Sequence, residues 1–194
     1  MRAVVDAVAD RLMVSDESSI RIPEICEATG VNYGSVYHHF GSREGVIDAA
    51  YNVLFTQLVE DDIAMLRSIG ETAVTIDGYV TSIRPIIAMM STGAQRSEQR
   101  AIRVRIVAAA LTRPELKELI GETQSRLTDE MVRIAEHGQN RGFLRRDISA
   151  RSVAVLVQVL VFGRTLDDTS AEPINQEDWG HTMLMLFMAL MNQS

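Results

Sequence analysis

The chain has almost no cysteine and no long apolar segment. Of its 194 residues only Cys26 carries a thiol, so no disulfide can form within the chain, and we expect this side chain to fill a small buried slot. No apolar run approaches the ~20 residues needed to cross a bilayer, and the N-terminus lacks the apolar core of a signal peptide. We therefore expect a cytoplasmic protein with no membrane partner.

The sequence also lacks the short motifs of common enzyme classes. A phosphate-binding loop of the form G-x-x-x-x-G-K-[ST] is excluded because Lys117 is the only lysine, and no G-x-S-x-G elbow, H-E-x-x-H pair or C-x-x-C appears. His38 and His39 have no further histidine, cysteine or acid at a metal-ligand spacing along a helix. These absences predict a protein that is not an enzyme and that uses no metal and no cofactor.

Residues 22–44, IPEICEATGVNYGSVYHHFGSRE, are the most informative stretch that is present. They fit a helix, a sharp turn at Gly30, where a residue able to take a positive φ is favoured, and a second helix. On the second helix Val36 and Phe40 share the packing side. The opposite, outward arc offers hydroxyl and imidazole groups and no acid, and consists of Tyr33, Gly34, Ser35, Tyr37 and His38. This pattern indicates a helix-turn-helix that reads DNA, although Tyr37 taken alone also fits a half-buried packing aromatic.

The stretch resembles the signature of the TetR family of bacterial repressors, roughly I-A-x-x-A-G-V-S-x-G-T-L-Y-x-H-F-x-S-K-E. The matching positions are Ile25, Cys26, Ala28, Thr29, Gly30, Val31, Asn32, Gly34, Ser35, Val36, Tyr37, His39, Phe40, Ser42, Arg43 and Glu44. The resemblance implies that Tyr33, Ser35, Tyr37, His38 and Arg43 touch DNA, and Gly34 on the outward face lets the backbone approach it. Tyr33 stands where a basic residue is common, so the resemblance does not carry over a base preference.

The same resemblance implies an all-α protein of about nine helices. A three-helix DNA-binding domain is expected in residues 1–48, followed by a helical ligand-binding and dimerisation domain in residues 49–194. The first 50 residues hold four arginines and eight acids, so the DNA-binding part has a net charge of −4 within a total of −7. Because phosphate contacts usually come from a basic patch, we expect modest DNA affinity with a shallow salt dependence. A module whose first helices bind a protein instead of DNA is the alternative that this charge favours.

Apolar periodicity and capping residues predict the helices outside this stretch. A first helix carries Val4, Val5, Val8 and Leu12. Later helices are expected at residues 43–68, 71–90 with a kink at Pro85, 95–111, 114–137, 152–162 and 176–191. Asp147 or Ser149 is expected to cap the helix at 152–162, and Asn175 the helix at 176–191. Gly138 and Gly142 are expected to end the helix at 114–137, and Gly163 to follow the helix at 152–162.

The last two predicted helices are apolar on nearly every side. We expect them to pack against their copies in a second subunit as a four-helix bundle, the usual dimer of the family that the chain resembles. The residues expected at this interface are Val155, Leu156, Leu160, Trp179, Met183 and Phe187. Burial inside a single subunit is the alternative, because helices that are apolar all round are often simply core.

For the middle of the chain the resemblance implies a ligand-binding role without naming a ligand. Adaptable or aromatic side chains predict an apolar cavity formed by Phe55, Tyr79, Met89, Met90 and Met131. An inward-turned Arg103 would add a preference for an anionic group, whereas a solvated arginine stripe is the plainer interpretation. The sequence thus predicts a dimeric repressor of a near-palindromic double-stranded operator, released by a small-molecule inducer. A DNA-organising protein of the same fold without a ligand remains the other alternative.

Overall fold

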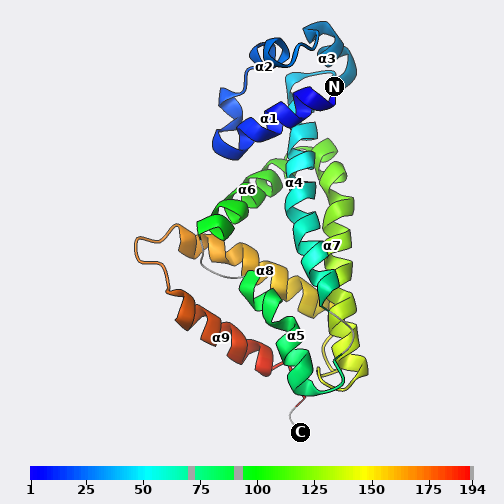
Figure 1. The fold of residues 1–194 in the computed structure, drawn as a ribbon, viewed down its shortest axis with the longest axis vertical. Helices are drawn as coiled ribbons and strands as arrows, with labels where there is room; N and C mark the ends of the chain where they lie inside the picture. The colour runs from blue at the N-terminus through cyan, green and yellow to red at the C-terminus, as the bar shows by residue number, and fades with distance from the viewer. Residues whose placement is uncertain (70–72, 90–93, 193–194) are drawn as a thin grey trace. The chain divides into compact units, whose positions relative to one another are not determined.

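The computed structural model describes residues 1–69, 73–89 and 94–192, and these residues form an all-α fold (Figure 1). The first helices are α1 (Arg2–Val14), a short 3-10 turn η1 (Glu17–Ser19), α2 (Ile22–Thr29) and α3 (Tyr33–Phe40). The longer helices that follow are α4 (Arg43–Ser68), α5 (Ile76–Met89), α6 (Ala94–Ala110), α7 (Pro114–Asn140), α8 (Ala150–Asp168) and α9 (Gln176–Met188). Within the described part of the chain the nine α-helices confirm the predicted fold class.

The chain divides into two compact units. The first comprises Met1–Val59 with Arg105–Thr123, and the second comprises Glu60–Val104 with Gln124–Ser194. Helices α4, α6 and α7 therefore each contribute residues to both units. The first unit is larger than residues 1–48 because it also contains residues 49–59 and the segment Arg105–Thr123 from the middle of the sequence. The division of function at residue 48 stays a prediction.

The first unit has an apolar core around α1. Val4, Val8 and Leu12 are fully buried, as the periodicity of the first helix predicts. Cys26 is buried and free, which agrees with a small space-filling role. Arg113, in the segment before α7, donates to Oε1 of Glu17 at 2.7 Å and to Oδ1 of Asp48 at 2.9 Å. These ion pairs tie the segment Arg105–Thr123 to the N-terminal helices.

The second unit buries apolar faces of α5, α7, α8 and α9, and α5 lies beside α9 (Figure 1). Buried charges join α6 to two other helices of this unit. Arg100 forms a two-pronged contact with Asp168 at 2.8 Å for both bonds, and Arg103 donates to Asp62. Of the arginine stripe on α6, which consists of Arg96, Arg100 and Arg103, two members therefore turn inward and are paired with acids.

Several predicted helix ends are correct and others are wrong. Ser149 and Asn175 cap α8 and α9 by accepting from the backbone of Ser152 and Asp178, as predicted. Gly163 lies inside α8 and does not end it. Gly138 likewise lies inside α7, where it faces Tyr79, and the chain turns only at Gly142 with φ of 76°. Within the described residues, no helix combines the length and the apolar character that crossing a membrane requires.

Candidate DNA-binding helix and ligand cavity

Helices α2 and α3 are joined by the tight turn that the sequence predicts. Gly30 has φ of 68°, a left-handed conformation that favours glycine, and its N–H donates to the carbonyl of Glu27 at 3.3 Å. Asn32 caps α3 by accepting from the backbone N–H of Ser35 at 3.1 Å. Val36 is fully buried on the inner side of α3. The local sequence therefore fixes both the turn and the face that α3 presents.

The outer face of α3 carries the predicted DNA contacts. Tyr33, Gly34, Ser35 and His38 are exposed, and Tyr37 is half-buried. The rings of Tyr33 and Tyr37 are in contact, with centroids 4.5 Å apart. A hydrogen bond with Tyr33, together with burial, raises the pKa of Tyr37, so its hydroxyl stays protonated and able to donate at neutral pH. No acid lies on α3, which leaves this face open to a phosphate backbone.

The side chain of Arg43 is engaged in contacts within the protein. Its guanidinium donates to the carbonyl of Glu17 and forms ion pairs with the carboxylates of Glu17 at 3.8 Å and Glu44 at 3.6 Å. These contacts hold the start of α4 against η1. The structure thus gives Arg43 a role in positioning this end of the helix-turn-helix, and its contact with DNA stays a prediction.

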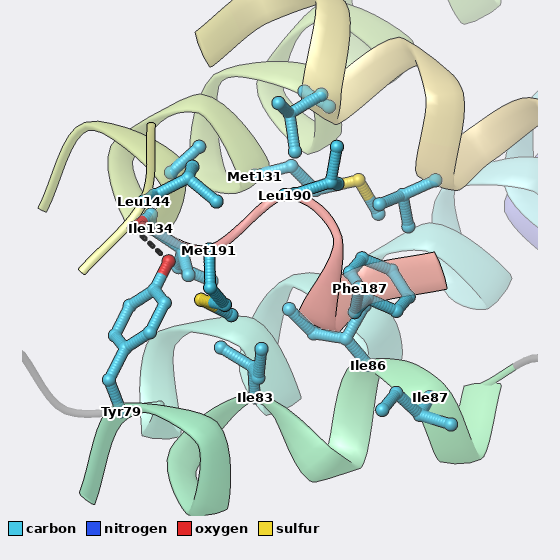
Figure 2. A pocket seen from close by; sticks show the side chains of 14 residues that line it. Tyr79, Ile83, Ile86, Ile87, Met131, Ile134, Leu144, Phe187, Leu190 and Met191 are labelled. Carbon is cyan, nitrogen blue, oxygen red and sulfur yellow. Dashed lines mark hydrogen bonds between the residues drawn. The ribbon is translucent and has the colours of Figure 1, made fainter. Parts of the chain in front are cut away.

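An apolar cavity lies within the second unit (Figure 2). Its empty space, counted out to its open mouth, is about 490 Å³, and the region in which the centre of a water molecule fits is about 40 Å³. Its walls come from α5, α7, α8, α9 and the segments around Leu144 and Met191. The lining residues are Tyr79, Ile83, Ile86, Ile87, Met131, Ile134, Ala135, Leu144, Val153, Ala154, Val157, Phe187, Leu190 and Met191.

Tyr79 supplies the one polar side-chain group among these lining residues. Its hydroxyl donates to the carbonyl of Ile134 at 3.1 Å, the dashed contact in Figure 2. Burial raises the pKa of Tyr79 to about 12, so the group stays neutral throughout the physiological range. Gly138 makes room for this ring, because a Cβ there would overlap the Tyr79 hydroxyl. The lining therefore contains no charge, and its hydroxyl is already engaged.

A second, much smaller hollow in the same unit is charged. It is lined by Asp62, Arg96, Gln99, Arg100, Arg103 and Val161. Arg96 and Arg103 both reach Asp62, at 3.3 Å and 2.5 Å, and Arg100 holds Asp168. Among the described residues, no group of three histidines, cysteines or acids is arranged to hold a metal ion.

Comparison with known proteins shows which family this chain resembles. A model described as "Bacterial regulatory proteins, tetR family" matches residues 18–50, the helix-turn-helix and the start of α4. The chain is 26% identical over 159 residues to the HTH-type transcriptional regulator UidR of Escherichia coli (strain K12). The matched segment covers 82% of this chain and 76% of UidR. The chain belongs to the TetR family of bacterial transcriptional regulators. It is accordingly a DNA-binding regulator and not an enzyme.

Two solved structures share the fold over nearly the whole chain. Salmonella enterica GusR superposes with a TM-score of 0.69 at 23% identity, covering 97% of this chain and 93% of that one. A putative transcriptional regulator from Saccharomonospora viridis, solved in complex with choline, gives a TM-score of 0.70 at 15% identity and covers 99% and 97% of the two chains. At these identities the likeness concerns the fold alone.

The cavity of this TetR-family chain contains two of the six residues predicted to bind a ligand. Tyr79 and Met131 line it, whereas Phe55 is buried in the first unit and Arg103 lies in the charged hollow. Met89 ends α5, but its side chain is not among those described, and Met90 lies outside the described residues. The rest of the α5 wall was not predicted. It consists of Ile83, Ile86 and Ile87, which follow Tyr79 at i+4, i+7 and i+8 and so share one helix face with it.

The residues predicted for the dimer interface fall into two groups. Val155 is 45% exposed, and Leu156, Leu160 and Trp179 are half-buried. Met183 and Phe187 are buried within the single chain, and Phe187 lines the cavity, so neither is available on the surface. The exposed apolar residues that the prediction overlooked on these helices are Val159, Leu166, Met185 and Met188. Because α9 is apolar on several sides, its periodicity could not show which side faces the core.

Gly45 provides a test of how the family's helix-turn-helix is held. A Cβ at this position would overlap the carbonyl oxygen of Phe40, a backbone atom at the end of α3. We expect Gly45→Ala to lower the free energy of unfolding by ~1–3 kcal/mol, as overpacking does, and to weaken DNA binding by displacing α3. Thermal unfolding and DNA titration measure the two effects.

Gly121→Ala in α7 is the matched control, because a Cβ there meets nothing within 4 Å. That variant should be as stable as the parent or up to ~1 kcal/mol more stable, since alanine favours helix over glycine. Equal stability of the Gly45 and Gly121 variants would contradict the role given to Gly45.

Proposed function

We propose that this TetR-family regulator is a dimeric, cytoplasmic repressor that binds a near-palindromic operator and leaves it when a small molecule enters the apolar cavity. The observation that carries the proposal is the cavity itself. It is lined by apolar side chains from four helices and lies in a different unit from the helix-turn-helix. Such pockets are the usual ligand sites of helical proteins.

The recognition surface supports the DNA half of the proposal. Tyr33, Ser35 and His38 are exposed on α3 with no acid among them. Two such helices in a dimer would enter successive major grooves ~34 Å apart, which matches a near-palindrome. Since the first 50 residues carry a net charge of −4, we expect few phosphate contacts and a shallow dependence of affinity on salt.

An exposed apolar stripe supports the dimer. Val155, Val159 and Leu166 on α8 are 45%, 58% and 81% exposed and follow the helical spacing i, i+4, i+11. Met185 and Met188 on α9 are 58% and 43% exposed. Large exposed apolar residues gathered on two helices mark an interaction surface, and a four-helix bundle formed with a second copy would bury them.

The size of the cavity supports release by ligand. The space open to water centres, about 40 Å³, corresponds to only a few water molecules, since one needs ~10–15 Å³ on this measure. We therefore propose that the ligand binds a state with a wider cavity. It shifts the population toward that state by its difference in affinity for the two. Helices α4, α6 and α7, which contribute residues to both units, are our candidates for transmitting the change.

The lining also bears on the kind of ligand. Choline, present in the Saccharomonospora viridis structure, carries a permanent positive charge, and no acid lines this cavity. Arg103 does not supply a site for an anion either, because it lies in the other hollow and pairs with Asp62. We therefore replace the expected preference for an anionic inducer by one for an uncharged molecule.

Footprinting of the DNA upstream of the gene tests the proposed function. We expect the parent protein to protect a near-palindrome and Tyr37→Ala/His38→Ala to bind it roughly 10- to 100-fold more weakly, as loss of one or two specific contacts does. His39→Ala is the control, since His39 is also exposed on α3 but lies off the predicted contact face. Protection that is unchanged in the double variant, or no protection at low salt, would contradict the proposal.

A further inference from the structure

The segment after α9 folds back over the apolar cavity and forms part of its wall. We call residues 189–192 the strap. Leu190 and Met191 both line the cavity, and Met191 is 5% exposed. Figure 2 shows their side chains between those of α5 (Tyr79, Ile83 and Ile86) and those of Met131, Ile134 and Leu144. The strap thus places two apolar side chains in the space that a ligand would use.

The strap is held by a short set of backbone contacts. Met191 lies opposite Leu144 in an isolated antiparallel bridge. The N–H of Arg145 donates to the carbonyl of Leu190 at 3.1 Å, and the N–H of Asn192 donates to the carbonyl of Phe143 at 3.0 Å. The side-chain amide of Asn192 adds a bond to the carbonyl of Gly142 at 2.7 Å. The strap and the segment around Leu144 are the two walls that lie outside the helices, and opening the strap breaks these few bonds without unfolding a helix. We therefore expect local opening of the strap to cost little free energy.

The chemistry of the strap indicates what can take its place. A ligand that displaces Leu190 and Met191 must satisfy the same surroundings, which are apolar and contain no charge. The one polar side chain among the lining residues, Tyr79, already donates to Ile134. An ionised group brought into this space would lose its hydration without gaining a partner.

Resting on the proposed function, we propose that the inducer is an uncharged, predominantly apolar molecule that enters by displacing the strap. Leu190 and Met191 then act as a built-in occupant of the cavity. The ligand takes over their contacts with α5 and with Leu144. Opening the strap limits the rate of ligand uptake, and the shape left by Leu190, Met191 and Phe187 determines which apolar molecules fit.

A reversible lock on the strap tests this proposal with the neutral dye N-phenyl-1-naphthylamine as probe. Leu144 and Met191 are directly opposite in a non-hydrogen-bonded pair, where Cα atoms lie ~4.5 Å apart and a disulfide can form. We expect oxidised Leu144→Cys/Met191→Cys to take up the dye at least tenfold more slowly than the same protein after reduction. Cys26 is buried and does not interfere. Equal uptake rates in the oxidised and reduced forms would overturn the gating role.

Three controls complete the experiment. Leu144→Ser/Met191→Ser should show no response to reductant. Ala154→Leu, which fills the cavity from α8, should abolish dye binding, whereas Val159→Leu on the exposed side of the same helix should not. If the Ala154→Leu variant bound the dye with the affinity of the parent protein, the dye would lie outside the cavity, and the proposed site would be wrong.

The ligand class is tested on the parent protein. The dye should bind there, and choline and dodecanoate should compete at least tenfold more weakly than an uncharged alcohol of the same chain length as dodecanoate. Stronger competition by either charged compound would overturn the assignment to uncharged ligands. A regulator that protects its operator but binds no dye would overturn this inference and leave the proposed function intact.

Discussion

A chain with glutamate at both Val159 and Met185 is expected to sediment as a monomer and to lose operator affinity by a factor on the order of 10²–10⁴. The two side chains are each 58% exposed, and they lie on α8 and α9 at the surface proposed for the dimer. In a dimer the second recognition helix binds as an intramolecular event, and separation of the subunits removes that advantage. Charges placed opposite their own copies in a symmetric interface would also repel one another.

Sedimentation velocity and operator titration, carried out on the same preparations, measure the two effects. Leu111→Glu is the matched control, because Leu111 is 78% exposed but lies outside α8 and α9. It should leave both the sedimentation coefficient and the DNA affinity unchanged. A Val159→Glu/Met185→Glu protein that remains dimeric would place the interface on another surface.

The second large effect is expected from Arg113→Met. Arg113 reaches Glu17 at 2.7 Å and Asp48 at 2.9 Å, and the carboxylate-bearing side chain of Asp48 is only 11% exposed. The hydrogen bond to Glu17 raises the pKa of the guanidinium against the opposing effect of burial, and the bond to Asp48 adds to the increase. Removal of the cation leaves a nearly buried carboxylate without this partner.

We expect Arg113→Met to lower the free energy of unfolding by ~2–3 kcal/mol. This is less than the loss of a fully buried partner, because a quarter of the Arg113 side chain and nearly as much of Glu17 are exposed to solvent. For a chain of this length the melting temperature should fall by roughly 5–10 °C. Arg2→Met is the control in the same unit, since Arg2 is almost fully exposed and pairs only at 3.6 Å with Asp6. A melting temperature equal to that of the control would show that the Arg113 contacts contribute little.

Local sequence was sufficient for the helix-turn-helix. Gly30 requires a positive φ, Asn32 caps the next helix, and Val36 alternates with the exposed residues of α3 at helical spacing. Each of these signals acts over three or four residues. The capping of α8 by Ser149 and of α9 by Asn175 was predictable for the same reason.

The roles of Gly138 and of the apolar helix α9 depend on contacts with other helices. Gly138 was expected to end a helix, but it lies within α7 and gives space to Tyr79, a residue from another helix. Phe187 was expected on the surface of the dimer, but it points into the cavity beside α5. A helix that is apolar on several sides fits either orientation, so only its neighbours decide which side is buried.

The sequence by itself determined the family, the all-α fold, most helix positions and the outward face of α3, because periodicity, caps and turn residues act over short distances along the chain. Only the tertiary structure decided that Arg113 joins Glu17, that Arg103 is held by Asp62, and that Tyr79 meets Ile134 at the cavity wall. These pairs are 96, 41 and 55 residues apart. Contacts over such distances depend on how whole helices pack, and no repeat of three or four residues encodes that packing.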